Sequence, residues 1–462
     1  MGCIRNRSRI WVSCFLLVGC VYFLSVYRAE ARFAIRFSPT LGELYTDNIF
    51  YTRDKEADFV TTITPTLSIL YAPEGQTLPV LNLNISPSAV IFGRHGELNN
   101  FGDNIALSGG YTYQYSPQLN FYVSDVFGRQ GNYRLGPLTQ GAFELPSSPT
   151  SPPPIGGTLP GQGNQNLSDL TSGGFSQLWN NFSLRGTYLY QPNISFTGGY
   201  TNNFIKYFEQ GGNDLWQRIG FRGVYNWRKE HNLHAGVSVD IYNNRDNSNV
   251  NNQRNNNVVV NFDFGDDFFS NFQINLSPTL TLTASTGISF NAGNNGPPVA
   301  NNTNIILTKI WETATLSGGV QHGLTSSYGV AGLSNTTSVN SQFSYQVTEK
   351  LSTLAGVNFS FYDTDDGNFQ TFQASAGARY QFTQWLASNL FYAYRWTDAS
   401  SQVARSDLLQ PGVVRANSVY LTLTLNFDVW PNIGLSRSVT SLVPLIRTPF
   451  PQPSVPTIQA PP

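Results

Sequence analysis

A short alternating pattern of apolar and polar residues recurs between turns from Phe33 almost to the C-terminus. In the stretch 372–382, with the sequence FQASAGARYQF, the even-numbered residues are apolar or aromatic and the odd-numbered residues are polar or small. Side chains of a β-strand alternate between the two faces of a sheet, so each such segment has one apolar and one polar face. The repetition therefore predicts a large all-β protein.

Alternation and turn positions together give about 18 strands, with a range of about 16–20. The expected strands are 33–46, 58–71, 78–92, 103–115, 118–127, 177–190, 193–203, 216–227, 232–242, 258–276, 280–291, 303–310, 312–322, 336–347, 351–362, 369–382, 385–397 and 417–429. The long apolar runs of a soluble core are missing. We therefore expect a transmembrane antiparallel β-barrel, with the apolar face toward lipid and the polar face around a lumen.

Composition agrees with a membrane barrel. Charged residues make up 12% of the chain, against about 25% in ordinary soluble domains, and aromatic residues reach 14%. Mean hydropathy is −0.21, and after Tyr27 no apolar run approaches the roughly 18 residues that a spanning helix needs. The net charge of −1 says nothing about nucleic acid, and the sequence has no basic block to suggest nucleic-acid binding.

The first 31 residues have the features of a cleavable signal peptide. A basic start is followed by the apolar stretch 10–27 and by the cleavage-type sequence Ala29-Glu30-Ala31. The length of the apolar stretch leaves an uncleaved anchor as one alternative, and a lipoprotein-type box ending at Cys20 is another. All three cysteines lie in this segment, so cleavage would leave a mature protein without thiols, which suits passage through an oxidising periplasm.

The barrel domain is expected to span 32–429. Tight connections at 116–118, 191–193, 277–279 and 348–350 would face the periplasm, and longer Asn- and Gly-rich loops would lie outside. The Pro- and Gly-rich segment 129–176 is expected to be a long surface loop, either mobile or folded inward as a constriction. The segment 430–462 is expected to be a Pro-rich periplasmic tail, as a spacer, a ligand for a periplasmic partner, or an inert extension.

Enzyme chemistry finds little support, and no catalytic, metal or cofactor site is predicted. His234, Ser238 and Asp240 share one face of a strand, but Ser238 and Asp240 would lie about 13 and 20 Å from His234, too far for a triad. The acidic stretch 363–368 loosely suggests calcium, but its glycine is misplaced for an EF-hand loop and a hairpin turn is expected there. None of the common hydrolase or phosphate-binding motifs occurs in the sequence.

Alternation also predicts which charged side chains enter the lumen. A charge on the lipid face would cost about 2–4 kcal/mol near the midplane, so charged residues belong on the polar face. Opposed arginines and aspartates would set a transverse field and hence solute selectivity; the alternative is a salt-bridged plug without an open path. The predicted pore-lining residues are Arg185, Arg218, Arg222, Asp240, Asp263, Arg379 and Arg395.

The segment Gly42-Glu-Leu-Tyr45-Thr-Asp47-Asn48 followed by Thr64-Pro65-Thr66-Leu67 has the form G-x-x-Y-x-D-N and then P-x-L. This pattern resembles the start of outer-membrane β-barrel porin families, including barrels encoded with exopolysaccharide synthesis systems. The later segment 343–351 resembles hairpins of the same families. The resemblance implies a large barrel in the bacterial outer membrane and a link to polysaccharide export.

Together these features predict an outer-membrane porin-like channel for small hydrophilic solutes. Two alternatives stay open: an exit pore or accessory barrel for exopolysaccharide secretion, and a non-conducting structural or adhesive barrel. The expected partners are outer-membrane lipid, lipopolysaccharide and the barrel-assembly machinery. The assembly machinery is expected because the last strand alternates as a terminal barrel strand does. That last strand presents Val419, Leu421, Leu423, Leu425 and Phe427 on one face.

Overall fold

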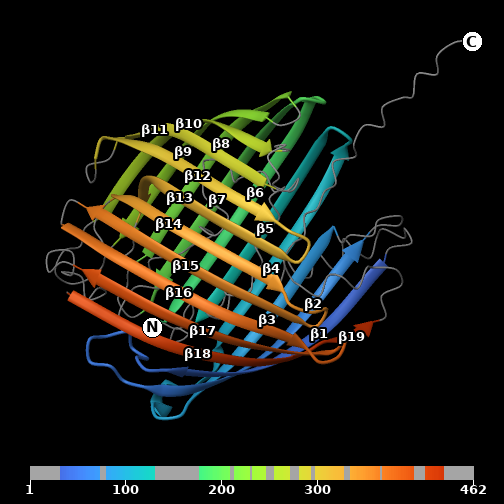
Figure 1. The fold of residues 1–462 in the computed structure, drawn as a ribbon, viewed down its shortest axis with the longest axis vertical. Coiled ribbons are helices and arrows are strands. Elements are labelled where there is room, and N and C mark those ends of the chain that lie inside the picture. Colours follow the sequence, from blue (N-terminus) through green and yellow to red (C-terminus); the bar gives the residue numbers. More distant parts are fainter. Residues whose placement is uncertain are drawn as a thin grey trace, which may run out of the picture.

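The structure is a computed structural model that describes part of the chain. The described residues are 32–72, 80–130, 176–208, 213–228, 231–245, 254–270, 280–292, 297–326, 333–364, 367–399 and 412–430. These residues form one antiparallel sheet that closes on itself (Figure 1). Each strand pairs with its neighbours in sequence, and the first strand also pairs with the last. The prediction of an all-β antiparallel barrel is therefore confirmed.

The barrel has 18 strand positions, and the last is occupied by two elements, β18 and β19, separated by Asn426. The elements are β1 (Arg32–Thr46), β2 (Asp58–Ala72), β3 (Leu81–Phe92), η1 (Gly96–Leu98), β4 (Asn100–Ser116), β5 (Leu119–Gln130), β6 (Gln177–Gln191), β7 (Ile194–Tyr207), β8 (Asn213–Arg228), β9 (His231–Arg245), β10 (Arg254–Ser270), β11 (Leu280–Asn291), β12 (Val299–Ile310), β13 (Ala314–Ser326), β14 (Leu333–Gln346), β15 (Leu351–Thr364), β16 (Gly367–Gln381), β17 (Leu386–Ala399), β18 (Gly412–Leu425) and β19 (Phe427–Trp430).

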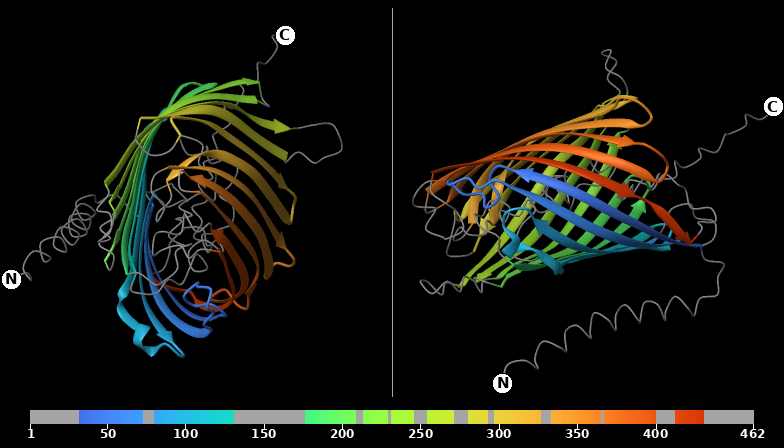
Figure 2. Two further views of the ribbon diagram at one scale, coloured as in Figure 1. Left: turned by 90° about the vertical axis from the view of Figure 1, so that its left-hand side faces the viewer. Right: turned by 90° about the horizontal axis from the view of Figure 1, so that it is seen from below.

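The barrel closes between β1 and β18. Their pairing runs in register from Thr40 opposite Thr424 to Thr46 opposite Ser418. Beyond Asn426, β19 continues the pairing along β1 with a register shift between Ile35 and Arg36. Figure 2 shows the resulting barrel almost end-on and from the side, with the blue and red ends of the sheet adjacent. Closure removes the two free edges that an open sheet of this size would present.

Exposed apolar side chains cover the outer face of the wall. On β2 the alternation places Phe59 outward with 57% of its surface exposed, whereas its neighbour Val60 points inward and is fully buried. The same alternation exposes Phe264 on β10 and Leu390 on β17. A soluble protein would bury such residues, whereas a transmembrane barrel presents them to lipid.

Large aromatic side chains mark one rim of the barrel on this outer face. Most connections between strands at this rim are short, and we call it the tight-turn rim; most connections at the opposite rim, the long-loop rim, are longer. Tyr and Trp concentrate at membrane–water interfaces, where the ring meets lipid and the polar atom meets water. The exposed aromatic residues at the tight-turn rim include Tyr115, Tyr190, Trp227, Trp311 and Trp385.

Most predicted strand boundaries differ from the observed ones by a few residues. The largest error is at 258–276: β10 begins earlier and ends at Ser270, and the rest of that segment, with the expected turn 277–279, lies outside the described residues. The long loop was expected from residue 129, but Arg129 and Gln130 belong to β5 and pair with β6. The remainder of that loop, the signal peptide 1–31 and the tail beyond Trp430 also lie outside the described residues. No helix among the described residues is both long and apolar enough to cross a membrane.

Candidate functional site on the inner wall

The seven charged residues predicted to enter the lumen all lie on the polar, inner face of the wall. Each is the direct sequence neighbour of an apolar or aromatic residue that faces outward, such as Ile219 beside Arg218 and Tyr380 beside Arg379. Their surroundings differ, however. Some are buried in polar networks of the wall and others are only half-buried, so the seven cannot contribute equally to a pore.

Arg218 and Asp240 form an ion pair across β8 and β9. They are directly opposite in the strand register, with Arg218 Nε 2.5 Å from Asp240 Oδ1 and Nη2 2.7 Å from Oδ2. Side-chain exposure is only 13% for Arg218 and 2% for Asp240. This two-point geometry matches the fork of the guanidinium to the carboxylate. The pair is therefore electrically neutral as a unit and largely withdrawn from solvent.

A ladder of amides and hydroxyls extends this pair across β10, β11 and β12. Asn261 donates from Nδ2 to Asp240 Oδ2 at 2.6 Å, and its Oδ1 accepts from Ser289 Oγ at 2.5 Å. Asn302 donates to Asn261 Oδ1 at 3.2 Å and also bonds Ser289. The sequence analysis missed these three residues, although their polar side chains fall at inward positions of alternating strands. They satisfy one another's hydrogen-bonding groups in a largely buried part of the wall.

An aromatic pair adjoins the same ion pair. Trp216 and Tyr242 stack with ring centroids 6.5 Å apart, and Trp216 Nε1 lies 3.3 Å from Asp240 Oδ1. The Arg218 guanidinium carbon is 5.1 Å from the centre of the Trp216 ring. Both rings are half-buried on the inner face. This part of the wall thus offers flat apolar surface next to hydrogen-bonding groups.

His234, Ser238 and Asp240, which share one face of β9, each contact other residues. Asp240 binds Arg218, Trp216 and Asn261, and Ser238 Oγ accepts from Asn261 Nδ2 at 3.3 Å. His234 lies over Gly265, where a Cβ would come 2.6 Å from His234 Nε2. The described residues contain no group of three or more His, Cys, Asp or Glu side chains that could hold a metal ion.

Arg222 on β8 and Asp263 on β10 lie on either side of Gly236, which is opposite both of them in the strand register. Arg222 is only 4% exposed. The Asp263 carboxylate lies over Gly236, at which a Cβ would be 2.5 Å from Asp263 Oδ1. Glycine at position 236 therefore leaves the space that the carboxylate occupies.

Arg185 on β6 and Arg379 on β16 are both half-buried on the inner face. Neither makes a hydrogen bond or an ion pair with any residue that the structure describes. Arg395 on β17 lies over the Tyr51 ring, with the guanidinium carbon 5.3 Å from the ring centre. Of the seven predicted residues, the structure thus joins Arg218 to Asp240 and places Arg222 and Asp263 on either side of Gly236, and the other three arginines lie apart.

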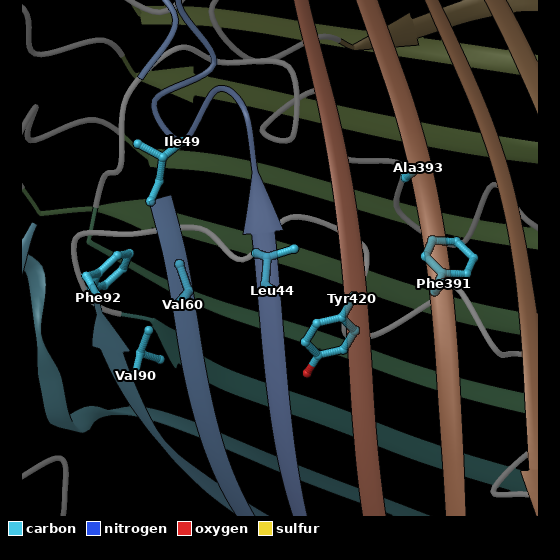
Figure 3. Packing of buried hydrophobic residues seen from close by; sticks show 8 residues of the cluster. All are labelled: Leu44, Ile49, Val60, Val90, Phe92, Phe391, Ala393 and Tyr420. Carbon is cyan, nitrogen blue, oxygen red and sulfur yellow. The ribbon is translucent and has the colours of Figure 1, made fainter. Parts of the chain in front are cut away.

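The connection between β1 and β2, residues 47–57, folds against the inner wall at the long-loop rim. Ile49 of this loop is 6% exposed and packs in an apolar cluster on the inner faces of β17, β18, β1, β2 and β3 (Figure 3). Alternation alone did not predict apolar side chains on this face. The cluster consists of Leu44, Ile49, Val60, Val90, Phe92, Phe391, Ala393 and Tyr420.

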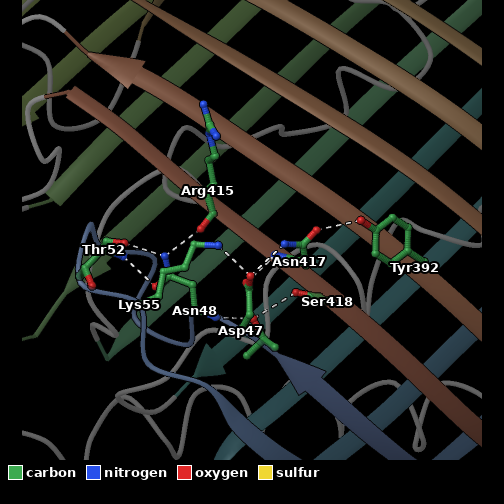
Figure 4. Close-up of polar contacts among 9 residues, drawn as sticks. Asp47, Asn48, Thr52, Lys55, Tyr392, Arg415, Asn417 and Ser418 are labelled. Atoms are coloured by element: carbon green, nitrogen blue, oxygen red, sulfur yellow. Dashed lines mark hydrogen bonds and ion pairs between the residues drawn. The ribbon is translucent and has the colours of Figure 1, made fainter.

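Asp47 and Asn48 join this loop to β18 from opposite sides of the wall. Asp47 accepts from Asn417 N at 2.6 Å, from Asn417 Nδ2 at 2.8 Å and from Lys55 Nζ at 2.7 Å (Figure 4). Burial alone would raise the pKa of the Asp47 carboxyl, but these hydrogen bonds outweigh it and hold that pKa below its ordinary value. The carboxylate is thus kept ionised at the seam between β1 and β18.

Asn48 is buried and uses its whole side-chain amide. Its Nδ2 donates to the carbonyls of Thr52 at 2.6 Å and of Arg415 at 2.9 Å, and its Oδ1 accepts from Thr52 N at 2.9 Å. The loop then turns at Tyr51, which has a left-handed φ of 51°. The Tyr51 hydroxyl bonds Thr397 Oγ1 at 2.7 Å, and burial raises the pKa of Tyr51. The loop is therefore held to both β18 and β17.

The next connection at this rim, residues 93–99, is bound to the same loop. The carboxylate of Asp58 accepts from the backbone N–H groups of Phe59, Arg94 and His95 at 2.7–3.2 Å. His95 Nδ1 lies 2.7 Å from Asp58 Oδ2, and His95 Nε2 lies 3.1 Å from Glu56 Oε2. These contacts, first of all that with Asp58, raise the pKa of His95.

The four defined residues of the G-x-x-Y-x-D-N segment all lie where β1 meets β18. A Cβ on Gly42 would lie 2.4 Å from the Tyr420 hydroxyl and 2.5 Å from Thr62 Oγ1, so the Tyr420 ring needs glycine there. Tyr45 is an outward-facing residue that packs on Phe59, with ring centroids 4.9 Å apart. Asp47 and Asn48 hold the loop as described. The segment is therefore explained by barrel closure and carries no information on a solute.

No protein-family model and no curated protein matches this sequence. Among solved structures, OccAB3 of Acinetobacter baumannii is similar at 10% identity, with a TM-score of 0.42 over 86% of this chain and 100% of that one. The outer membrane protein opdK of Pseudomonas aeruginosa is similar at 10% identity, with a TM-score of 0.41 over 85% and 99%. OpdL of Pseudomonas aeruginosa is similar at 11% identity, with a TM-score of 0.41 over 86% and 99%.

The class of the protein follows from its own geometry. A closed 18-strand sheet with an apolar outer face, a polar inner face and an aromatic rim is a transmembrane β-barrel of the outer-membrane type. Open edges would leave backbone groups unpaired in lipid, and closure between β1 and β18 satisfies them. The chain is thus an outer-membrane β-barrel.

Proposed function

We propose that this barrel is a porin-like channel for the passive passage of small hydrophilic solutes. The observation that carries the proposal is the strand number combined with the polar inner wall. Barrels of 16–18 strands are wide enough that their side chains leave an aqueous channel. The loop 47–57 occupies only one side of the long-loop rim, against β17, β18 and β1–β3.

A planar lipid bilayer tests the channel directly. We expect the purified protein to give stable, voltage-independent current steps after insertion, because water and ions would pass through a preformed lumen. Correct folding is checked independently by the β-type circular dichroism spectrum and by protease resistance in the same vesicles. A silent bilayer containing correctly folded protein would contradict the channel and would leave a structural or adhesive barrel.

Saccharide passage is a second candidate, favoured by one observation. The half-buried Trp216 and Tyr242 rings lie beside the Arg218–Asp240 pair, and sugars bind to flat aromatic faces flanked by hydrogen-bonding groups. Tyr122 on β5 and Trp179 on β6 are two further half-buried aromatic residues at inward positions, whereas Phe369 and Phe391 are only 1% and 2% exposed. The Trp216–Tyr242 pair combines two stacked rings with hydrogen-bonding groups, so saccharide passage is best tested at this surface.

If saccharides use this surface, Trp216→Ala should weaken the block of ion current by sugar oligomers. Loss of the ring removes the stacking surface, so a higher oligomer concentration should be needed for half-maximal block. Trp227→Ala is the matched control, because Trp227 lies on the outer face of the same strand and is 49% exposed. Equal block in the wild type and in both variants would exclude the Trp216 surface as a sugar site.

A further inference from the structure

The charged side chains of the inner face are unequal in number. Among the residues whose side chains the structure describes, six arginines and three aspartates occupy inward positions of the strands. The arginines are Arg36, Arg185, Arg218, Arg222, Arg379 and Arg395, and the aspartates are Asp58, Asp240 and Asp263. The described part of the inner wall therefore carries an excess of positive charge, in contrast to the whole chain with its net charge of −1.

Each of the three aspartates is compensated where it lies. Asp240 is held by Arg218 and Asn261 and is 1% exposed. Asp58 is equally buried and accepts from three backbone N–H groups and from His95. Asp263 lies across Gly236 from Arg222. Negative charge on the described wall is thus matched locally and would contribute little to the field in the lumen.

Arg185 and Arg379 are different, because neither has a hydrogen-bonding or ion-pair partner among the described residues. Their strands, β6 and β16, are eight positions apart one way round the ring of 18 and ten the other way. The two arginines therefore project from nearly opposite sides of the barrel. Both lie in the half nearer the tight-turn rim: β16 ends at Gln381, two residues after Arg379, and β6 ends at Gln191, six residues after Arg185.

We propose that the lumen selects anions over cations and that Arg185 and Arg379 are its selectivity-determining residues. The preferred solutes are small hydrophilic anions, including inorganic anions and organic carboxylates. This inference rests on the proposed channel function. Charged side chains facing a lumen set ion selectivity, and arginine is the side chain used in anion pores because it stays ionised in partly dehydrated surroundings.

The test is the reversal potential of single channels across a gradient of potassium chloride. The wild-type protein should show a chloride-to-potassium permeability ratio above one in dilute salt. Arg185→Gln and Arg379→Gln should each lower this ratio about fourfold in dilute salt, because a unit charge about 10 Å from the ion path in water changes the chloride and potassium concentrations about twofold each, in opposite directions. The corresponding lysine variants keep the charge and should keep the ratio. Raising the salt to about 1 M, where the screening length is about 3 Å, should bring the ratio toward one.

Lys206→Gln is the matched control, because it removes a cation from the outer face. Lys206 is exposed on β7, with its Nζ 5.5 Å from the centre of the Phe208 ring, and its loss should leave the ratio unchanged. A wild-type ratio at or below one, or a ratio unaffected in both arginine variants while current flows, would overturn the selectivity proposal alone. Folded, inserted protein that passes no current would instead overturn the channel, and the selectivity proposal with it.

Discussion

Replacing Asp240 by alanine should lower the free energy of unfolding by about 3–5 kcal/mol, the usual cost of leaving one member of a buried ion pair without its partner. Arg218 is 13% exposed and has its guanidinium directed at the Asp240 carboxylate. The substitution also removes the acceptor of Asn261 Nδ2 and of Trp216 Nε1. Reversible denaturant titration of the refolded protein in lipid vesicles would measure the change.

The double variant Arg218→Met with Asp240→Leu distinguishes the loss of one charge from the loss of the whole ion pair. Removing both charges together should recover much of the loss, because an apolar replacement of a whole buried pair is often neutral or stabilising. The exposed contact between Lys55 and Asp47 provides a comparison: Lys55→Ala should cost at most about 1 kcal/mol, as for surface ion pairs. A cost below about 1 kcal/mol for Asp240→Ala would mean that lumen water solvates Arg218, contradicting its assignment as a buried wall residue.

The double variant Asp47→Ala with Asn48→Ala should release the loop 47–57 from the inner wall. It removes the acceptors for Asn417 and Lys55 and all three hydrogen bonds of the buried Asn48 amide. Each buried polar group left unpaired costs about 1–3 kcal/mol. We therefore expect faster amide hydrogen exchange in 47–57 and larger, noisier single-channel currents, because the loop would no longer be held at the side of the lumen.

Lys55→Ala is also the control for this loop. It removes one exposed partner of Asp47 but leaves the bonds to Asn417, so exchange in 47–57 and the current should stay close to wild type. Unchanged exchange protection in the double variant would show that the remaining contacts, those of Ile49, Tyr51 and Glu56, hold the loop. That result would contradict the role assigned here to Asp47 and Asn48.

Strand number and face could be predicted from the sequence because both depend on local alternation. Each apolar position that faces lipid is followed by a residue that does not, and the predicted strand 280–291 coincides with β11 for this reason. The inward positions of Arg185 and Arg379 follow from the same rule. Errors occurred at strand ends, as at β10, where polar residues before Val258 extend the pairing without an apolar signal.

The contacts of the wall could not be predicted in the same way. Asp47 binds Asn417, which is 370 residues away, and this contact exists only because β1 meets β18. The opposition of Arg218 to Asp240 depends on the register between β8 and β9, which alternation does not specify. The inward apolar cluster around Val60 also contradicts the simple expectation of a polar inner face, because the loop 47–57 covers that part of the wall.

The apolar cluster has a consequence for the order of assembly. Leu44, Ile49 and Val60 come from the first two strands and their loop, whereas Phe391, Ala393 and Tyr420 come from the last two. With Val90 and Phe92 of β3, five of the eight residues are thus made early, and they lack the other three until the final strands have been made. Docking of β18 buries both groups and binds the loop through Asn417 at the same time. Completion of the barrel and fixation of the loop thus become a single cooperative step, which an incomplete chain cannot perform.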